Sequence, residues 1–165
     1  MKFNKDNLSK ELPRIPRAVS VSDFFELSDI GRKLAKIHLH YESASPFPVK
    51  IEHGKVTKPE HYYVRKMKFA KKEDKSRVIY NEFITISEIP LEAYEYILNG
   101  KPALEWIMER YAVTTDKDSG ITNDANDWAT ETENNPKYIL ELFQRIITVS
   151  LESMKLVSEI PKLGL

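Results

Sequence analysis

The chain has 165 residues, of which 41% are hydrophobic, and its two Trp, seven Phe and eight Tyr residues exclude global disorder and predict a folded core. It contains no cysteine, which excludes disulfides, thiolate metal sites and a cysteine nucleophile and favours a reducing compartment. The formal net charge is +0, a balance that gives a polyanion no overall attraction.

The balanced charge is unevenly distributed along the chain. Residues 1–36 carry eight Lys and Arg against five Asp and Glu, residues 50–77 carry ten against four, and residues 78–165 carry seven against fifteen. Because DNA is attracted by the first half and repelled by the second, we predict that any DNA-docking face is built from residues before about position 80. The alternative is that charges of both signs merely solvate the surface.

Targeting and membrane segments are not visible in the sequence. No apolar run approaches the roughly 20 residues that cross a bilayer, and the first seven residues lack the hydrophobic stretch of a signal peptide. We therefore expect a soluble, cytoplasmic protein with no membrane partner.

The N-terminal part predicts a non-helical opening followed by one helix. Pro13 and Pro16 fix φ and bias the residues before them toward extended geometry. Ser22 is a suitable N-cap, and we predict a helix from about Asp23 to Tyr41. The residues expected on its buried face recur at helical spacing: Phe24, Leu27, Ile30, Leu34, Ile37 and Tyr41.

The middle of the chain predicts a short antiparallel sheet. Residues 49–51, 62–69, 78–80 and 83–86 alternate in part or are rich in β-branched and aromatic side chains. The charged residues 71–77 separate the second of these segments from the third. We therefore predict a hairpin with a basic tip.

Two helices are predicted after the sheet. Pro90 opens one that runs through Leu98 with Asn99-Gly100 as its C-cap, and Pro102 opens a second over residues 103–111. Four glutamates make this helix-turn-helix-like pair acidic, which favours a scaffold role over insertion into a DNA groove. The residues expected on the core side are Tyr94, Ile97, Leu104, Trp106 and Ile107.

A polar loop and a last helix complete the pattern. Residues 116–127 resemble a calcium-binding loop only faintly, because Ile121 stands where such a loop needs glycine, and we predict Asx turns instead. Asn135 and Pro136 predict the start of a long helix that ends at Ile160-Pro161. We expect an α+β fold in which a short antiparallel sheet with a basic hairpin is packed by an N-terminal helix and three C-terminal helices. The whole chain, 1–165, is predicted to be a single domain or part-domain.

Motifs for catalysis or cofactor binding are absent from the sequence. It has no Gly-rich phosphate loop, no Gly-x-Ser-x-Gly and no His-Glu-x-x-His. His38 and His40 stand two positions apart on the predicted helix, so they point to different faces and are poor joint metal ligands. We predict no catalytic residue, no metal site and no cofactor in this segment.

The basic hairpin is the strongest functional candidate, because its cations can contact phosphates and a two-stranded ribbon fits a major groove. The structural alternative is that lysines at a hairpin tip protect a sheet edge and keep the protein soluble. Tyr80 and Asn81 are candidates for base edges, and the cations are candidates for phosphates. The complete set of candidate DNA-binding residues is Arg14, Arg17, Arg32, Lys33, Lys66, Lys68, Lys71, Lys72, Arg77, Tyr80 and Asn81.

An ordered series of short segments runs along nearly the whole chain. They are Leu12–Pro16, Gly31–Ala35 with His38 and Tyr41-Glu42, Lys66-Met67, Tyr80-Asn81, Ile89-Pro90 through Ala93-Tyr94, Asn99–Lys101, Ala103–Trp106, Glu109–Tyr111, Asp116, Ser119–Ile121, Asn123-Asp124, Asn126–Trp128 and Asn135–Tyr138. In this order they resemble the C-terminal specificity region of Type ISP restriction-modification enzymes.

That family consists of single polypeptides that join a nuclease, a helicase-like motor, an adenine methyltransferase and a target-recognition domain. The resemblance implies restriction of foreign DNA, with this segment helping to read an asymmetric target on double-stranded DNA. It also implies the upstream methyltransferase and helicase-like domains as partners. Their motifs, including Asn-Pro-Pro-Tyr, are absent here, so we expect a fragment or a truncated reading frame without cleavage, ATPase or methylation activity.

A second role stays open beside DNA contact. The densest part of the resemblance falls in the acidic half, around Trp106 and Trp128, which favours a structural docking segment that positions the methyltransferase and an upstream DNA-reading region. A continuous basic groove on the surface favours the first role, and an exposed apolar patch favours the second.

Overall fold

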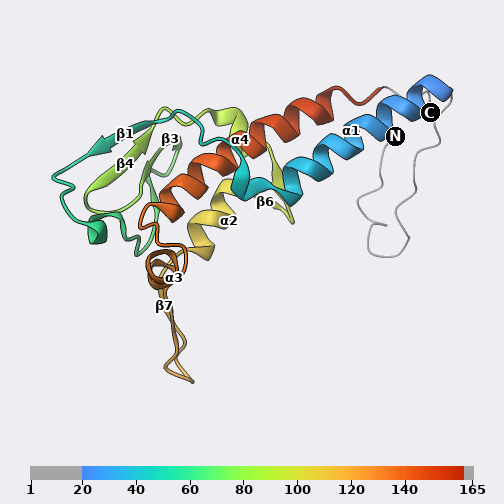
Figure 1. Cartoon of the computed structure of the whole chain (residues 1–165). Helices are drawn as coiled ribbons and strands as arrows, with labels where there is room; N and C mark the ends of the chain where they lie inside the picture. Colours follow the sequence, from blue (N-terminus) through green and yellow to red (C-terminus); the bar gives the residue numbers. More distant parts are fainter. Residues whose placement is uncertain (1–19, 162–165) are drawn as a thin grey trace.

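The computed structural model describes residues 20–161, and in it a small antiparallel sheet lies beside a long C-terminal helix (Figure 1). The sheet has the strand order β1-β4-β3-β2, with β1 at Lys50–His53, β2 at Lys68–Lys71, β3 at Asp74–Ile79 and β4 at Ile84–Ser87. The helices are α1 (Val21–Leu39), α2 (Ala103–Arg110), α3 (Ala125–Glu131) and α4 (Tyr138–Ser158). The expected α+β class, with an N-terminal helix before the sheet and C-terminal helices after it, is confirmed, although α3 is not one of the helices that the sequence predicts.

Helix α1 begins earlier than the sequence predicts. Ser20, and not Ser22, is its N-cap: the Ser20 hydroxyl accepts from the Asp23 amide at 3.1 Å, and the Asp23 carboxylate accepts from the Ser20 amide at 3.2 Å. This reciprocal capping box needs the two residues three positions apart, a spacing that Ser22 does not have. The helix ends at Leu39, so Tyr41 lies in a separate 3-10 turn, Tyr41–Ser43.

The predicted buried face of α1 is covered except at its N-terminal end. Ile30 is buried, at 5% exposure, and Leu27, Leu34 and Ile37 are half-buried, whereas Phe24 in the first turn is 58% exposed. The reason is tertiary, because α1 packs mainly along α4 and its first turns extend past the end of that helix (Figure 1).

The predicted basic hairpin is present as β2 and β3, but its first strand is shorter than expected and its second strand, Asp74–Ile79, begins inside the predicted tip of residues 71–77. Residues 59–62 form a 3-10 turn, and residues 63–67 have no regular structure, so the predicted strand over 62–69 is wrong except at its end. The backbone groups there bond to the side chains of Asn81 and Asn126, which prevents ladder pairing. Lys71 pairs with Asp74, which closes a tight turn at residues 72 and 73.

The helix predicted from Pro90 to Leu98 is wrong. Only a 3-10 turn forms there (Leu91–Tyr94), followed by strand β5 (Ile97–Leu98), which pairs with β6 (Lys101–Pro102). Asn99 has φ 49° and Gly100 has φ 81°, the two positive values that a tight hairpin turn of the primed class requires. Asn99-Gly100 is therefore a hairpin turn and not a helix C-cap. The predicted helix-turn-helix-like pair is absent, because α2 follows a β-hairpin and not a helix.

The side chains expected in the core around α2 divide into two groups. Tyr94 and Leu104 are buried, at 7% and 0% exposure, as predicted. Ile97 and Trp106 are 52% and 40% exposed. Ile97 is exposed because it lies on the β5–β6 hairpin, which the sequence misassigned as helix.

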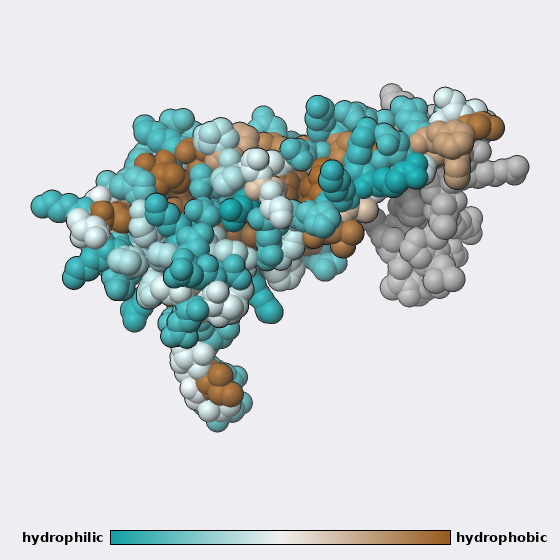
Figure 2. Space-filling model, viewed as in Figure 1, coloured by the Kyte–Doolittle hydropathy of each residue, from teal (hydrophilic) through white to brown (hydrophobic). Residues whose placement is uncertain are grey.

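A second small hairpin, which the sequence did not predict, projects from the body of the molecule (Figure 1). Its strands are β7 (Thr114–Thr115) and β8 (Thr122–Asn123). The predicted Asx turn lies between them, where the Asp116 carboxylate accepts from the Ser119 amide and hydroxyl, both at 2.8 Å. Figure 2 shows an apolar spot at the tip of this hairpin, whose exposed large hydrophobic residue is Ile121 at 69%.

Helix α4 begins at Tyr138, after Asn135 and Pro136, and the Asn135 side chain accepts from the Lys137 amide at 3.0 Å. It supplies the centre of the core, where Phe143 is fully buried and shares one cluster with Ile86 of β4 and with α2. Burial of apolar area in this cluster is the main stabilising force of the fold. No helix within residues 20–161 is long and apolar enough to span a bilayer.

Candidate nucleic-acid interface

Five cations lie close together around the edge strand β2. Arg65, Lys66, Lys68, Lys71 and Lys72 occur within eight residues that contain no carboxylate, and we call residues 65–72 the cationic stretch. β2 is the last strand of the sheet, so its outer edge faces solvent, and all five side chains are exposed. None of the five forms an ion pair within residues 20–161. Their charges are therefore available to an anion.

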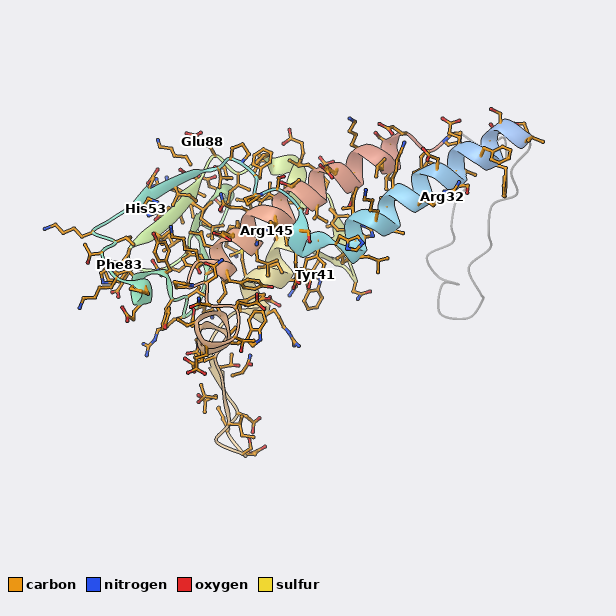
Figure 3. All side chains as sticks on the ribbon, viewed as in Figure 1. Arg32, Tyr41, His53, Phe83, Glu88 and Arg145 are labelled. Atoms are coloured by element: carbon orange, nitrogen blue, oxygen red, sulfur yellow. The ribbon has the colours of Figure 1, made fainter. Side chains whose placement is uncertain are left out.

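A recess of about 540 Å³ opens at one end of the cationic stretch. Three cations line it, namely Arg65, Lys66 and Lys68, together with the rings of Tyr63 and Phe83. Figure 3 shows Phe83 at the end of the sheet where β1 ends and β4 begins. A recess that combines cations with aromatic faces offers contacts for both phosphates and bases.

The two walls of the recess are joined by Asn81. Its amide nitrogen donates to the carbonyls of His61 and Tyr63, both at 2.9 Å, and its carbonyl accepts from the amides of Phe83 and Ile84, both at 2.8 Å. One side chain thus makes four hydrogen bonds and fixes the loop before β2 to the turn before β4. The hydrogen-bonding groups of the Asn81 side chain are all used within the protein, so this side chain is not available for base contact.

The opposite side of the same loop is fixed by α3. The Asn126 side chain, only 4% exposed, accepts from the Val64 amide and donates to the Val64 carbonyl, both at 2.9 Å. The Tyr63 hydroxyl lies 3.0 Å from the Thr130 hydroxyl of the same helix. Because polar side chains anchor the loop on both sides, the recess is preorganised although it lacks regular secondary structure.

Tyr80 is not available for base contact either. It is fully buried, and its hydroxyl donates to the Tyr62 carbonyl at 2.9 Å. Burial raises the pKa of the phenol above its usual value, because the charged form would lie in an apolar environment. A base edge cannot reach this hydroxyl. Tyr80 is therefore a core residue and not a DNA contact.

Tyr80→Phe tests this correction. The substitution keeps the ring and removes one buried hydrogen bond, so we expect the free energy of unfolding to fall by about 1 kcal/mol. Nucleic-acid binding should not change. Urea unfolding measures the first quantity, and duplex binding measures the second. A loss of base selectivity in the variant would return Tyr80 to the interface.

The remaining candidate cations are not gathered at this recess. Arg32 and Lys33 lie on α1, and Figure 3 shows Arg32 at the opposite end of the molecule from Phe83. Lys33 pairs with Asp29 at 2.6 Å, and this hydrogen bond and charge raise the pKa of its ammonium group. Arg14 and Arg17 lie outside the described residues, and their assignment stays a prediction.

Two hairpin cations are engaged within the fold. Arg77 pairs with Glu52 of β1, across the intervening strand β4. Lys75 bonds to Glu105 at 2.7 Å and lies over the Tyr94 ring, 5.5 Å from its centroid. Both belong to β3 and not to the tip of the hairpin. We expect neither to supply phosphate contacts as readily as the cations of β2.

Sequence reasoning missed Arg65, Tyr63 and Phe83 as members of the interface. A count of charges in short windows finds Arg65, because it begins the run of cations without a carboxylate. No local pattern identifies the two rings, since the turn that brings Phe83 to Tyr63 depends on the hydrogen bonds of Asn81. Among the described residues, no group of three or more His, Asp or Glu side chains is arranged to hold a metal ion.

An apolar groove of about 410 Å³ lies elsewhere on the surface, beside α2. Its walls include Leu98, Trp106 and Ile107 together with Tyr41 from the 3-10 turn after α1. Trp106 is 40% exposed and its indole nitrogen donates to the Leu98 carbonyl at 2.8 Å, so its orientation is fixed. An ordered, half-exposed tryptophan of this kind is typical of protein contact surfaces.

Comparison with solved structures finds ten similar chains, of which three are described below. The ATP-dependent Type ISP restriction-modification enzyme LlaBIII bound to DNA is 40% identical, with a TM-score of 0.83 over 97% of this chain and 10% of that one. A nuclease-deletion mutant of the Type ISP enzyme LlaGI in complex with a DNA substrate mimic is 44% identical, with a TM-score of 0.80. The match covers 94% of this chain and 12% of that one. The matching chain of the DrdV–DNA complex is 29% identical, with a TM-score of 0.76. The match covers 96% of this chain and 16% of that one.

These three chains are much longer than the one described here, which spans between a tenth and a sixth of their lengths. No curated protein matches the sequence. The family model of the Type ISP C-terminal specificity domain matches residues 2–142. The family model and the match to LlaBIII each cover most of this chain. We conclude that the chain belongs to the family of Type ISP C-terminal specificity domains.

Proposed function

We propose that this chain is the DNA target-recognition module of a Type ISP restriction-modification enzyme and that it contacts double-stranded DNA through the cationic stretch. The solved relatives are described as complexes with DNA, which supports the class of ligand. The single observation that carries the placement is the set of five exposed cations at residues 65–72 without an ion-pair partner in the described part of the chain.

The dimensions of β2 suit a nucleic-acid backbone. Lys68 and Lys71 stand at the two ends of the strand, at most roughly 10 Å apart at about 3.3 Å per residue, because the strand has an irregularity between Phe69 and Lys71. That length corresponds to about three base pairs at about 3.4 Å each. Cations at both ends of an exposed strand edge can thus contact phosphates on either side of a short base sequence, which fixes the register of the protein on the duplex.

The duplex affinity of the chain, measured by fluorescence anisotropy over a series of salt concentrations, tests this proposal. Lys71→Gln with Lys72→Gln removes two phosphate contacts. We expect the slope of log K against log salt to fall in magnitude by about 2 and the affinity at low salt to fall about tenfold or more. Gln keeps most of the side-chain length, so the turn itself should be unaffected.

Lys36→Gln with Lys155→Gln is the matched control, since it changes the net charge equally at two exposed lysines of α1 and α4. This pair should leave the salt slope unchanged. If both pairs weaken binding equally, total charge and not the cationic stretch governs the affinity. If the wild-type chain binds no duplex, the lysines of β2 act only as edge protection.

We further infer that the chain has no catalytic activity and needs no cofactor by itself. In that role it reads the target, and other parts of a longer polypeptide supply restriction and modification. Upstream methyltransferase and helicase-like domains are its expected partners. The length of the solved relatives supports this division of labour.

The apolar groove beside α2 supports a second candidate function, docking of this domain onto the rest of such an enzyme. In that function the chain positions the methyltransferase and an upstream DNA-reading region. The groove contains Trp106 and is lined mostly by apolar and aromatic side chains, which suit a protein neighbour better than a phosphate backbone. The duplex measurement discriminates the two functions, because a purely structural segment shows no salt-dependent binding. The two functions are also compatible, since they use different surfaces.

A further inference from the structure

The recess beside the cationic stretch contains two carboxylates among its cations. Glu60 comes from the 3-10 turn before the loop, and Glu82 comes from the turn between β3 and β4. Both side chains are exposed, and neither forms an ion pair within residues 20–161, although Arg65, Lys66 and Lys68 line the same recess. Anionic groups in a surface that attracts DNA require a separate explanation.

A carboxylate cannot serve as a phosphate contact. Two like charges about 4 Å apart repel by about 1 kcal/mol in water and by more where solvent is excluded. Glu60 and Glu82 therefore oppose docking wherever they meet the backbone of a duplex. They become favourable only where they meet hydrogen-bond donors, and the donors that DNA presents in the major groove are the exocyclic amino groups of cytosine and adenine.

The fold holds the backbone of both glutamates at defined positions. Asn81, which directly precedes Glu82, donates to the carbonyl of His61, which directly follows Glu60, and accepts from the Phe83 amide on the other side of Glu82. Stacking of the His61 and Phe83 rings, with centroids 4.4 Å apart, joins the same two segments again. Because the two turns are connected, their backbones lose little conformational freedom on binding and only the side-chain rotamers must be ordered, which favours selective contact.

We propose that Glu60 and Glu82 are specificity-determining residues that accept hydrogen bonds from the amino groups of cytosine or adenine in the major groove, while the neighbouring cations hold the phosphates. This assignment rests on the proposed function. Guanine and thymine present only acceptors or a methyl group at the corresponding positions, so the carboxylates reject them. The interface consequently carries selectivity in its acidic residues and affinity in its basic ones.

Selection from a pool of randomised duplexes, followed by sequencing of the retained DNA, tests the proposal on the full chain. We expect the wild-type chain to enrich a motif with cytosine or adenine at fixed positions. Glu82→Ala and Glu60→Ala remove the acceptor altogether, which Gln would retain, and should each reduce the preference at one position by about tenfold. Affinity for unselected duplex should stay equal or rise slightly, because a charge that repels phosphates is lost.

Glu152→Ala on α4 is the control, since Glu152 is exposed and lines a different groove. It should enrich the wild-type motif, and thermal unfolding should show that all three variants are folded. If wild type and both recess variants enrich the same motif equally, the glutamates do not read bases and DNA recognition itself still stands. If the wild-type chain enriches no motif, target recognition by this chain fails, and the assignment of the glutamates fails with it.

Discussion

Asn81→Ala is expected to lower the free energy of unfolding by about 3 kcal/mol, because the side chain makes four hydrogen bonds whose net contributions are about 0.5–1.5 kcal/mol each. The substitution leaves the carbonyls of His61 and Tyr63 and the amides of Phe83 and Ile84 without these partners. Urea unfolding followed by tryptophan fluorescence measures the change. It is expected to be among the largest effects of any polar substitution in the described structure.

The same substitution should also separate sequence selection from charge attraction. The cations of β2 remain, so we expect non-specific duplex binding to persist, whereas the walls of the recess are no longer joined and motif enrichment should fall. Asn123→Ala is the matched control, because Asn123 is exposed on β8 and its side chain makes no hydrogen bond within residues 20–161. An Asn81→Ala variant with wild-type stability would show that the two turns are held by other contacts.

Phe143→Ala is expected to have the second large effect, a loss of about 3–5 kcal/mol in the free energy of unfolding. Phe143 is fully buried at the centre of α4, where its ring belongs to the cluster that joins the sheet to the helices. Removing it deletes apolar contacts and leaves a cavity that the surrounding elements cannot close completely. A loss of this size is a large fraction of the total stability of a typical domain.

Phe24→Ala provides the comparison for that substitution. It removes the same ring from α1, at a position that is 58% exposed and lies on the part of the helix that extends past α4. We expect a change within about 0.5 kcal/mol. If both alanine variants unfold at the same urea concentration, Phe143 is not part of a tightly packed core.

The two surfaces of the domain differ in how they are built, and this difference bears on their roles. The recess is formed by loops that Asn81 and Asn126 hold in place, and the cations around it have no ion-pair partner in the described residues. The groove beside α2 is apolar and is built on a helix. A polar, cationic surface suits DNA, whereas an apolar surface suits a protein neighbour.

Several elements could be predicted because their determinants are local. The presence of a basic hairpin could be predicted, although most of the charged segment forms strand β3 and not the turn, and α2 follows from Pro102 and the helical spacing after it. The charge division between the two halves is also a property of the sequence alone. Asn99-Gly100 shows the limit, since the same dipeptide ends a helix or turns a hairpin, and only the pairing of β5 with β6 decided which.

The sequence by itself determined the family, the fold class and the region in which the cations gather. Only the tertiary structure decided which polar residues of that region face outward. Tyr80 and Asn81 are adjacent to the hairpin in sequence, but one is buried in the core and the other joins two turns. The physical reason is that alternation along a strand shows which side chains share a face, but not which face is covered. Hydrogen bonds from side chains to distant backbone groups, such as those of Asn81, leave no local pattern to read.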